Sequence, residues 1–485
     1  LLLLISEMGN SVDEARRRRG YRHRHDGKHH MDNNSTNCSG SGSGSWITSK
    51  QDGSLGMLQE YYNRHLVTLP ASPRRKQIKW FHWNRPVADP PIQEGWGIER
   101  FGIRFLWSSE HKLPRDLQLL RSQGDRAADE LLEKLSTMAS ATTAAESSYD
   151  KKEKKNGDDV LTKLPRKYID KYGYPPKWLK PDLINRGQEV FRRYWPSCVV
   201  ILFYISLCAG FSAPLISDVL IVTGYLNGKR MKVIKRLFET GYMIMACMMK
   251  GGLDKGQLGW KSVTRVRFLH ARVRRRMMQR GNSKRLPKNE EGLKEKKKSQ
   301  EEVAINQEDM AVTLLAFSYN VIIGIAILKG SQLKEEDQAA YLHVWRYIGF
   351  LIGIDDQHNP CNKGMEFARK RLESILMHVL HPDDSSAKLV NQVLKATGTT
   401  FMPYEARGLV LRSLLGSEWS DKLELPRYET ASLGVRLCTW WFFTFIGWYT
   451  YFCSLPFIGR AFLMFHTQLL RLILWITPVQ LFPLS

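Results

Sequence analysis

The sequence predicts an all-α fold, a bundle of several helices. Apolar residues recur at helical spacing in several segments, and almost no segment alternates between apolar and polar residues as a half-buried strand does. The chain has 485 residues, of which 43% are hydrophobic. This supply of apolar side chains is sufficient to bury a large core.

Positive charge dominates the chain, with 72 Lys and Arg against 48 Asp and Glu and a formal net charge of +24. Such an excess is typical of proteins that bind nucleic acid or an anionic membrane surface. Much of the charge lies in three runs, residues 16–30, 151–155 and 272–298. None of these runs is interleaved with the aromatic side chains that a base-stacking surface needs. The pattern therefore disfavours nucleic acid as a partner and favours a membrane surface.

The seven cysteines are scattered along the chain and form no C-x-x-C pair. Their neighbours are mostly apolar, so neither a zinc site nor a disulfide framework is predicted. Free, buried thiols indicate a domain that faces a reducing compartment such as the cytosol.

The segment before residue 164 divides into a tail, an extension and a linker. Residues 1–56 are rich in Arg, His, Ser and Gly from Arg16 onward, and are predicted to be a disordered tail because they offer no apolar core. Residues 57–135 contain four Trp among charged residues and are predicted to form an ordered extension. Residues 136–163 are rich in Ser, Ala, Thr and Lys, which predicts a linker.

Residues 164–436 carry the predicted helices of the main domain. Pro196–Ile216 is an uncharged stretch of 21 residues that is long enough to span a membrane. Pro214 interrupts it, so a pair of buried core helices explains it equally well. Further helices are predicted for residues 232–249, 262–280, 306–328 and 341–354, with a solvated Lys/Glu-rich insert at residues 281–302. Asn306, followed by first-turn acids, is expected to cap the helix that it opens.

The C-terminal segment, residues 437–485, differs in kind. Leu437–Gly459 contains 23 uncharged residues, bracketed by Arg436 and Arg460 and dense in Trp, Tyr and Phe. It is long enough to span a bilayer. Crowded Trp and Tyr equally suit a segment that lies in the headgroup interface, continued by the amphipathic stretch at residues 461–476. Membrane attachment is favoured for this segment over packing on the helical core.

One histidine stands out as a candidate ligand. His270 lies on a predicted helix beside an apolar stripe of Val266, Leu269 and Val273. Arg267, three residues earlier, lies on the same side and can pair with an anionic group such as a heme propionate. A neutral imidazole is the common protein ligand of heme iron. A histidine in such a stripe is equally compatible with a structural role.

Several short motifs occur in a fixed order along the main domain. They are Arg236-Leu-Phe-Glu-Thr240, Gly259-Trp260, Val266-Arg-Phe-Leu-His-Ala271, Ile305-Asn-Gln-Glu-Asp309, Thr313-Leu-Leu-Ala-Phe-Ser318, Tyr341-Leu-His-Val-Trp-Arg346, Leu411-Arg-Ser-Leu-Leu-Gly416 and Leu425-Pro426. No single motif is specific, but the ordered set resembles the catalytic domain shared by rubber oxygenases (latex clearing proteins) and mpaB-type membrane-bound oxygenases. The resemblance covers a little over half of the chain, from about residue 164 to residue 426.

The resemblance implies a helical bundle with a globin-like, heme-binding core. It makes His270 the axial ligand of a b-type heme and places Arg236 and Thr240 close to the heme on the active side. Arg236 is expected to hold a propionate or polarise bound oxygen, and Thr240 to donate a hydrogen bond. The chain departs from latex clearing proteins at two positions. Glu239 stands where they have a Lys that can occupy the sixth iron position, and Leu220 falls near their proposed basic carboxylate.

The implied activity is that of an oxidoreductase, a heme-dependent oxygenase that cleaves a C=C bond of an isoprenoid-like or other apolar substrate with dioxygen. The implied location is a membrane, at the endoplasmic reticulum with the catalytic domain facing the cytosol. Two alternatives remain open. One is a non-catalytic membrane protein in which His270 is structural, and the other is a heme sensor or carrier with the same fold. His343, in the Tyr341–Arg346 motif, is the next candidate ligand.

Overall fold

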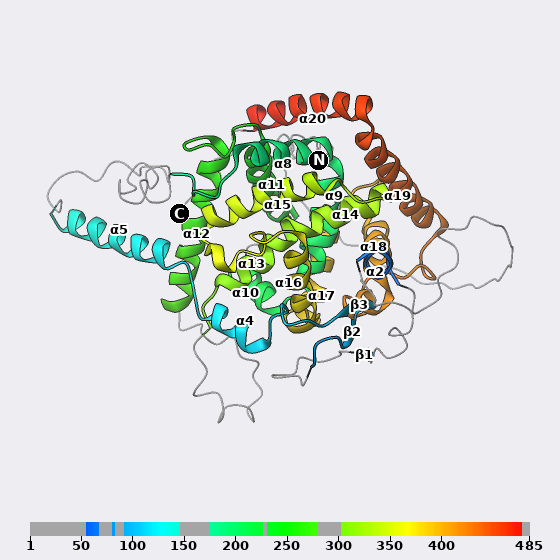
Figure 1. Cartoon of the computed structure of the whole chain (residues 1–485), viewed down its shortest axis with the longest axis horizontal. Coiled ribbons are helices and arrows are strands. Elements are labelled where there is room, and N and C mark those ends of the chain that lie inside the picture. Colours follow the sequence, from blue (N-terminus) through cyan, green and yellow to red (C-terminus); the bar gives the residue numbers. More distant parts are fainter. Residues whose placement is uncertain are drawn as a thin grey trace, which may run out of the picture. The chain divides into compact units, whose positions relative to one another are not determined.

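The computed structural model describes residues 55–66, 80–82, 92–145, 174–224, 226, 230–279 and 302–477. Its elements are, in chain order, α2 (Met57–His65), β1 (Trp80–His82), β2 (Gly97–Arg100), β3 (Ile103–Leu106), α4 (Pro114–Arg121), α5 (Arg126–Ala145), α8 (Pro181–Arg193), α9 (Trp195–Ile201), the π-helix η2 (Leu202–Cys208), α10 (Pro214–Val222), α11 (Arg230–Met248), α12 (Leu258–Gln279), α13 (Gln307–Phe317), α14 (Tyr319–Lys329), α15 (Glu335–Ile352), the 3-10 helix η5 (Asp356–His358), α16 (Met365–His378), α17 (Asp384–Thr397), α18 (Tyr404–Lys422), α19 (Leu433–Ser454) and α20 (Pro456–Ile476). Helices make up most of this structure (Figure 1), which confirms the predicted all-α class.

The predicted extension, residues 57–135, is part of the same core as the helices that follow it. Its three strands form a small sheet in the order β1-β2-β3, with β1 parallel to β2 and β2 antiparallel to β3. Helix α2 packs against α18 and β3. Tyr62 and Phe105 are almost fully buried in the main apolar cluster. The sequence predicted that this segment is ordered. It did not predict that the segment packs into the same core as the later helices.

Two predicted boundaries change. Leu55 and Gly56, assigned to the disordered tail, belong to the described structure, where Gly56 is the N-cap of α2. A side chain at Gly56 would clash with the backbone of Leu414 and Gly416, so this position is tightly packed. Residues 136–145 of the predicted linker continue helix α5. The rest of the tail and linker, and nearly all of the insert at residues 281–302, lie outside the described residues.

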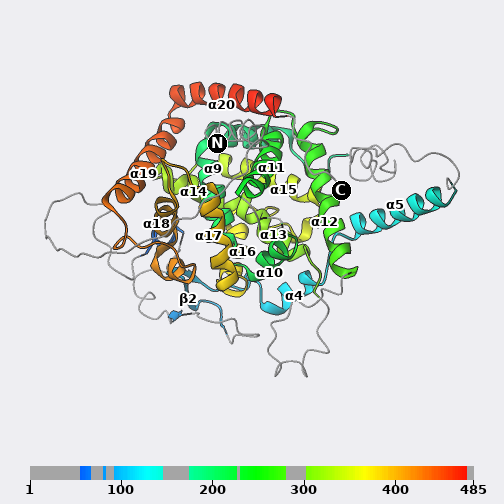
Figure 2. The ribbon, with the colours of Figure 1, turned by 180° about the vertical axis from the view of Figure 1, so that it is seen from behind.

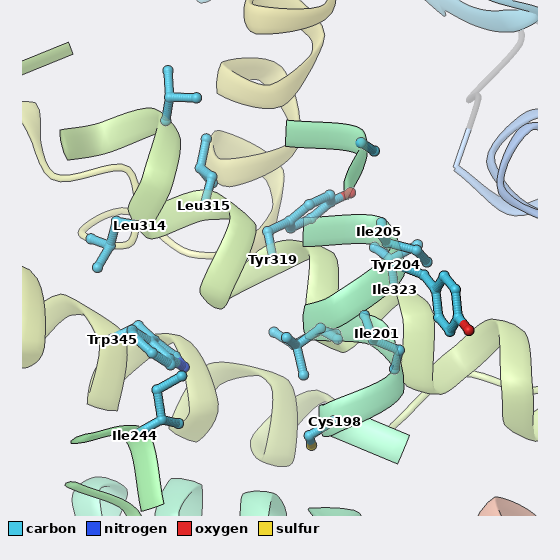
Figure 3. Packing of buried hydrophobic residues seen from close by; sticks show 14 of the residues in the cluster. Cys198, Ile201, Tyr204, Ile205, Ile244, Leu314, Leu315, Tyr319, Ile323 and Trp345 are labelled. Atoms are coloured by element: carbon cyan, nitrogen blue, oxygen red, sulfur yellow. The ribbon is translucent and has the colours of Figure 1, made fainter. Parts of the chain in front are cut away.

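The long uncharged stretch at residues 196–216 contains the break that the helix-pair alternative predicts. Helix α9 runs into η2, and a new helix, α10, begins at Pro214. Cys198, Ile201 and Ile205 of the first part are almost fully buried. They pack with Tyr319 and Ile323 of α14 (Figure 3).

The remaining predicted helices are observed with modest changes. Residues 232–249, 262–280 and 341–354 correspond to α11, α12 and α15. The predicted helix at residues 306–328 is two helices, α13 and α14, which meet at Ser318. Asn306 caps α13 as predicted, because its side chain accepts a hydrogen bond of 2.8 Å from the backbone N–H of Asp309.

Helices α11 and α12 approach each other very closely just after the turn that joins them. A Cβ atom on Gly259 would lie 2.7 Å from Cα of Cys247 and 2.8 Å from the carbonyl oxygen of Ala246. Glycine therefore allows the two helices to pack against each other at this point. Gly241, also in α11, differs because a Cβ there would meet nothing within 4 Å.

These two glycines give a matched test of the α11–α12 contact. We expect Gly259→Ala to lower the free energy of unfolding by about 1–3 kcal/mol, because the added methyl group meets backbone that cannot move aside. Gly241→Ala should raise it by about 0.5–1 kcal/mol, since alanine favours an unobstructed helix interior. Urea unfolding followed by circular dichroism measures both. Equal effects of the two substitutions would contradict the proposed close approach.

Candidate functional site

Helix α12 places His270 in a half-buried position. Its Nδ1 atom is buried and has no hydrogen-bond partner among the described residues. Burial and, to a smaller extent, the positive charge of Arg274 together lower the pKa of His270 to about 4, although Asp125 opposes the shift. The imidazole is therefore neutral near pH 7, which is the form that binds a metal ion.

His270 lies on a face of α12 that carries both apolar and basic side chains. By helical spacing it shares this face with Val266, Val273 and Met277 and with the buried Arg267 and Arg274. Val273 and Met277 pack against Val219 of α10. A neutral imidazole with an unsatisfied nitrogen on such a face fits an apolar, iron-containing ring such as heme. A purely structural histidine would be expected to find a hydrogen-bond partner.

Arg267, one turn before His270, pairs with Asp125. Its Nε and Nη2 atoms donate to the two carboxylate oxygens at 2.5 and 2.8 Å, and both side chains are almost fully buried. This carboxylate already neutralises the guanidinium, so an anionic propionate would gain little there. The contacts give Arg267 a structural role in fixing α12, and its predicted contact with a heme propionate stays a prediction.

Helix α11 carries Arg236 and Thr240 one turn apart, on the same face. Arg236 is partly exposed, and its Nη1 donates to Oε2 of Glu239 at 2.8 Å. The hydroxyl of Thr240 donates to the carbonyl oxygen of Arg236 at 3.2 Å. Glu239 itself is fully buried, and its Oε1 accepts no hydrogen bond. The sequence pointed to Glu239 only as a departure, whereas the structure shows a buried carboxylate.

The packing of α11 on α12 sets the relative heights of these residues. Ala246 contacts Gly259 where the two helices meet. Arg236 lies ten residues before Ala246, and His270 lies eleven residues after Gly259. At 1.5 Å per residue these are rises of about 15 and 17 Å along antiparallel helices, so Arg236 and His270 lie at similar heights.

The position near Leu220 offers no carboxylate of its own. Leu220 is half-buried in α10, next to Val219, which faces α12. The nearest acidic residue in this helix is Asp218. The departure from latex clearing proteins at this position stays a prediction.

Two other histidines compare with His270. His343 is buried, but its Nε2 accepts a hydrogen bond of 3.0 Å from the backbone N–H of Lys180 and its ring packs on the edge of Trp178. These contacts explain a structural role for His343. His378 of α16 is 8% exposed, and neither of its ring nitrogens has a hydrogen-bond partner in the described part of the chain. His378 lies outside the recognised motifs, so no sequence pattern singled it out.

Two cavities of the described structure do not suit heme. A cleft of about 540 Å³ adjoins Arg267, but its lining includes the acids Asp125, Glu130, Asp355 and Asp356, which would repel propionates. An apolar cavity between α2, η2 and α14 has a volume of only about 60 Å³, below the size of a cofactor pocket. Neither is lined by His270.

Comparison with known proteins decides the family. A sequence model of the family described as "ER-bound oxygenase mpaB/B'/Rubber oxygenase, catalytic domain" matches residues 192–448, slightly more than half of the chain. The chain belongs to the mpaB/rubber oxygenase family. This match includes Arg236, Thr240 and His270, and it extends into α19. A comparison with curated protein sequences finds no significant match.

A solved structure of the same family has a similar fold. The structure titled "Structure of Latex Clearing Protein LCP in the closed state" aligns with a TM-score of 0.51 and 16% sequence identity, over 74% of this chain and 91% of that chain. The share of this chain exceeds what residues 192–448 contribute, so the similar fold includes elements outside the matched region. Membership of the mpaB/rubber oxygenase family supports an oxygenase-type function, which places the chain among the oxidoreductases.

Enclosed histidines give this mpaB/rubber oxygenase family member a predictable response to acid. His270, His343, His378 and His381 each have a pKa lowered to about 4, in every case mainly because burial disfavours the charged ring. In the unfolded chain each takes up a proton near pH 6.5. Between those pH values the unfolded state binds protons that the folded state refuses, so the free energy of unfolding falls as the pH falls.

We therefore expect the melting temperature to drop between about pH 7 and pH 5, where few carboxylates titrate. Circular dichroism melts at a series of pH values measure this. The variant His378→Gln, which lacks one of the titrating rings, should show a shallower pH dependence than the wild type. A melting temperature that stays constant over this range would contradict the assigned pKa shifts.

Proposed function

We propose that the chain is a heme-dependent oxygenase that acts on an apolar, isoprenoid-like substrate at a membrane surface. The observation that carries this proposal is His270, a neutral imidazole whose buried Nδ1 finds no hydrogen-bond partner among the described residues. Membership of the mpaB/rubber oxygenase family supports the oxygenase chemistry. A latex clearing protein is among the proteins of similar fold, which suggests an apolar substrate.

In this proposal His270 supplies the protein bond to the iron. When bound, a b-type heme supplies the redox chemistry by which dioxygen converts one C=C bond into two carbonyl groups. Val266, Val273 and Met277 exclude water from the face that carries His270. Neutral His270 keeps a lone pair available because burial disfavours its protonation.

The residues of α11 have separate roles in the proposal. Arg236 is held by Glu239 and retains a partly exposed guanidinium that can orient an anionic propionate. Thr240 offers a hydroxyl one turn away, where it can turn from the Arg236 carbonyl to an oxygen atom of the reactants. Glu239 pairs with Arg236 through Oε2, and its Oε1 lies 3.9 Å from Nζ of Lys235. It is our candidate for the carboxylate that Leu220 cannot provide.

Membrane association is the second part of the proposal. The family description includes endoplasmic-reticulum-bound oxygenases. Two described segments, Gln307–Lys329 and Pro456–Ile476, are long and apolar enough to cross a membrane by length and composition. The first is mostly buried in the helical core, whereas the second is mostly exposed. We therefore assign the association to the C-terminal helices, at the endoplasmic reticulum and with the catalytic domain on the cytosolic side.

His270→Ala is the direct test of the ligand. We expect this variant to lose the heme absorption band while its helical circular dichroism is retained, because the bond to iron is lost and the apolar packing remains. His378→Ala is the control, since it also removes an enclosed histidine without hydrogen bonds, and it should keep the band. A wild-type spectrum in His270→Ala, or loss of the band in His378→Ala alone, would contradict the assignment.

Arg236→Ala and Thr240→Ala should separate binding from turnover. Neither residue bonds to the metal in the proposal, so both variants should retain at least part of the heme. Turnover should fall about a hundredfold or more, the usual effect of losing a positioned hydrogen-bond donor. Formation of carbonyl groups from a short polyisoprene oligomer, measured per bound heme, gives the result. Unchanged turnover per heme in both variants would contradict the proposed roles of Arg236 and Thr240 in the reaction.

The wild-type protein separates the competing functions. Heme with turnover supports the oxygenase. Heme without turnover of any isoprenoid supports a sensor or carrier, which the absence of a carboxylate at Leu220 would explain. Protein that binds no heme at all supports a membrane protein in which His270 is structural.

A further inference from the structure

The outer sides of α19 and α20 expose a continuous series of large apolar side chains. Most of the exposed large hydrophobic residues in the described structure belong to these two helices. The most exposed aromatic residues among them are Trp441, Phe445, Trp448, Phe457, Phe465 and Trp475, which are 60–85% exposed. Apolar surfaces of this extent usually mark a binding face for protein or membrane.

The composition of this surface favours a lipid bilayer over a protein. Residues 433–476 contain no Asp or Glu, and their charged residues are Arg436, Arg460 and Arg471. All three arginines are exposed. Mixed Trp, Tyr and aliphatic side chains with basic residues suit the region between acyl chains and anionic headgroups. An acidic protein partner would satisfy the arginines but not so large an aromatic surface.

The inner sides of the same helices are fixed to the helical core. Figures 1 and 2 show α20 beside α8 and α11, and α19 beside α14 and α18. His466 of α20 is fully buried, with Nδ1 donating to the carbonyl oxygen of Arg192 at 2.8 Å and Nε2 accepting from Tyr449 of α19. Thr450 of α19 shares a hydrogen bond of 2.7 Å with Ser197 of α9. These polar contacts hold both helices in place.

This attachment decides how the helices can meet a bilayer. A span formed by α20 would draw α8, packed beside it, into the hydrocarbon. Helix α8 carries Glu189 paired with Arg193, and its Arg186 pairs with Asp337, with exposed or partly exposed side chains. Burying these charges in lipid is costly. An orientation parallel to the membrane leaves them in water and places the aromatic side chains in the interface.

We propose that α19 and α20 form an in-plane docking surface that binds an anionic bilayer through its exposed aromatic face. This deepens the membrane association proposed above but does not depend on heme. The surface also adjoins the site, because the hydroxyl of Tyr242 in α11 donates to the carbonyl oxygen of Leu474 in α20 at 3.4 Å. The helix that carries Arg236 and Thr240 thus lies directly behind the docking surface, where an apolar chain can leave the bilayer.

Vesicle flotation of the full chain tests the docking surface. Wild-type protein should float with phosphatidylcholine vesicles and float more completely when phosphatidylserine is included. Trp441→Glu and Trp475→Glu should each weaken vesicle binding about tenfold or more, because each places a charge where an aromatic ring was buried in the interface. Leu119→Glu is the matched control, since Leu119 of α4 is 53% exposed and lies outside this surface.

Cysteine labelling tests the orientation of α20. Arg460→Cys and Arg471→Cys introduce thiols toward its two ends, at exposed positions that the proposal leaves at headgroup level, and the protein is added to the outside of preformed vesicles. A membrane-impermeant maleimide should label both thiols, because both ends of an in-plane helix stay on the outer side. Protection of one end only would show a span and overturn the in-plane arrangement.

Three results would overturn the docking proposal itself. They are folded wild-type protein that does not float, unchanged flotation of both Trp variants, and a wild-type dimer that the Trp variants convert to monomer without any vesicle binding. The last result would show that the surface of α19 and α20 binds a second copy of the chain and not a bilayer. Heme absorption in the same samples keeps the two proposals apart, since flotation without heme contradicts only the proposed oxygenase.

Discussion

The buried ion pair between Arg267 and Asp125 is the contact on which the arrangement of the site depends. It joins α12 to the segment that leads into α5, over 142 positions of sequence. Gly353, at the end of α15, makes room for it, since a Cβ there would lie 2.1 Å from the Asp125 carboxylate. Gln307 of α13 donates to the carbonyl oxygens of both Gly124 and Gly353. Four parts of the chain therefore meet one turn from His270.

This junction explains how the fold can tolerate His270, whose Nδ1 has no hydrogen-bond partner among the described residues. Two buried charges are tolerated because each satisfies the other with two hydrogen bonds, and removing one partner of such a pair typically costs about 3–5 kcal/mol. The junction holds α12 in one orientation, which fixes the backbone position of His270. The close contact at Gly259 limits α11 in the same way. The unsatisfied nitrogen is thus maintained by contacts elsewhere in the structure, as expected of a preorganised ligand.

Local patterns in the sequence predicted the helices and the Asn306 cap, because spacing and capping are properties of neighbouring residues. The motif order identified the family and singled out His270. Contacts between residues that are distant in the sequence could not be predicted from such local patterns. No local pattern links Asp125 to Arg267, so the sequence did not predict this ion pair. The burial of Glu239 and the isolation of His378 likewise depend on packing between helices distant in sequence, and spacing alone did not reveal them.

We propose that this helical fold holds one heme through His270. Titration of the purified full chain with hemin, followed by the Soret absorption band, tests this proposal. We expect saturation at one heme per chain, with a resonance Raman iron–histidine stretching band in the reduced protein. Hemin that binds without a saturable stoichiometry, or saturates without that band, would contradict the claim even if the helical fold is intact.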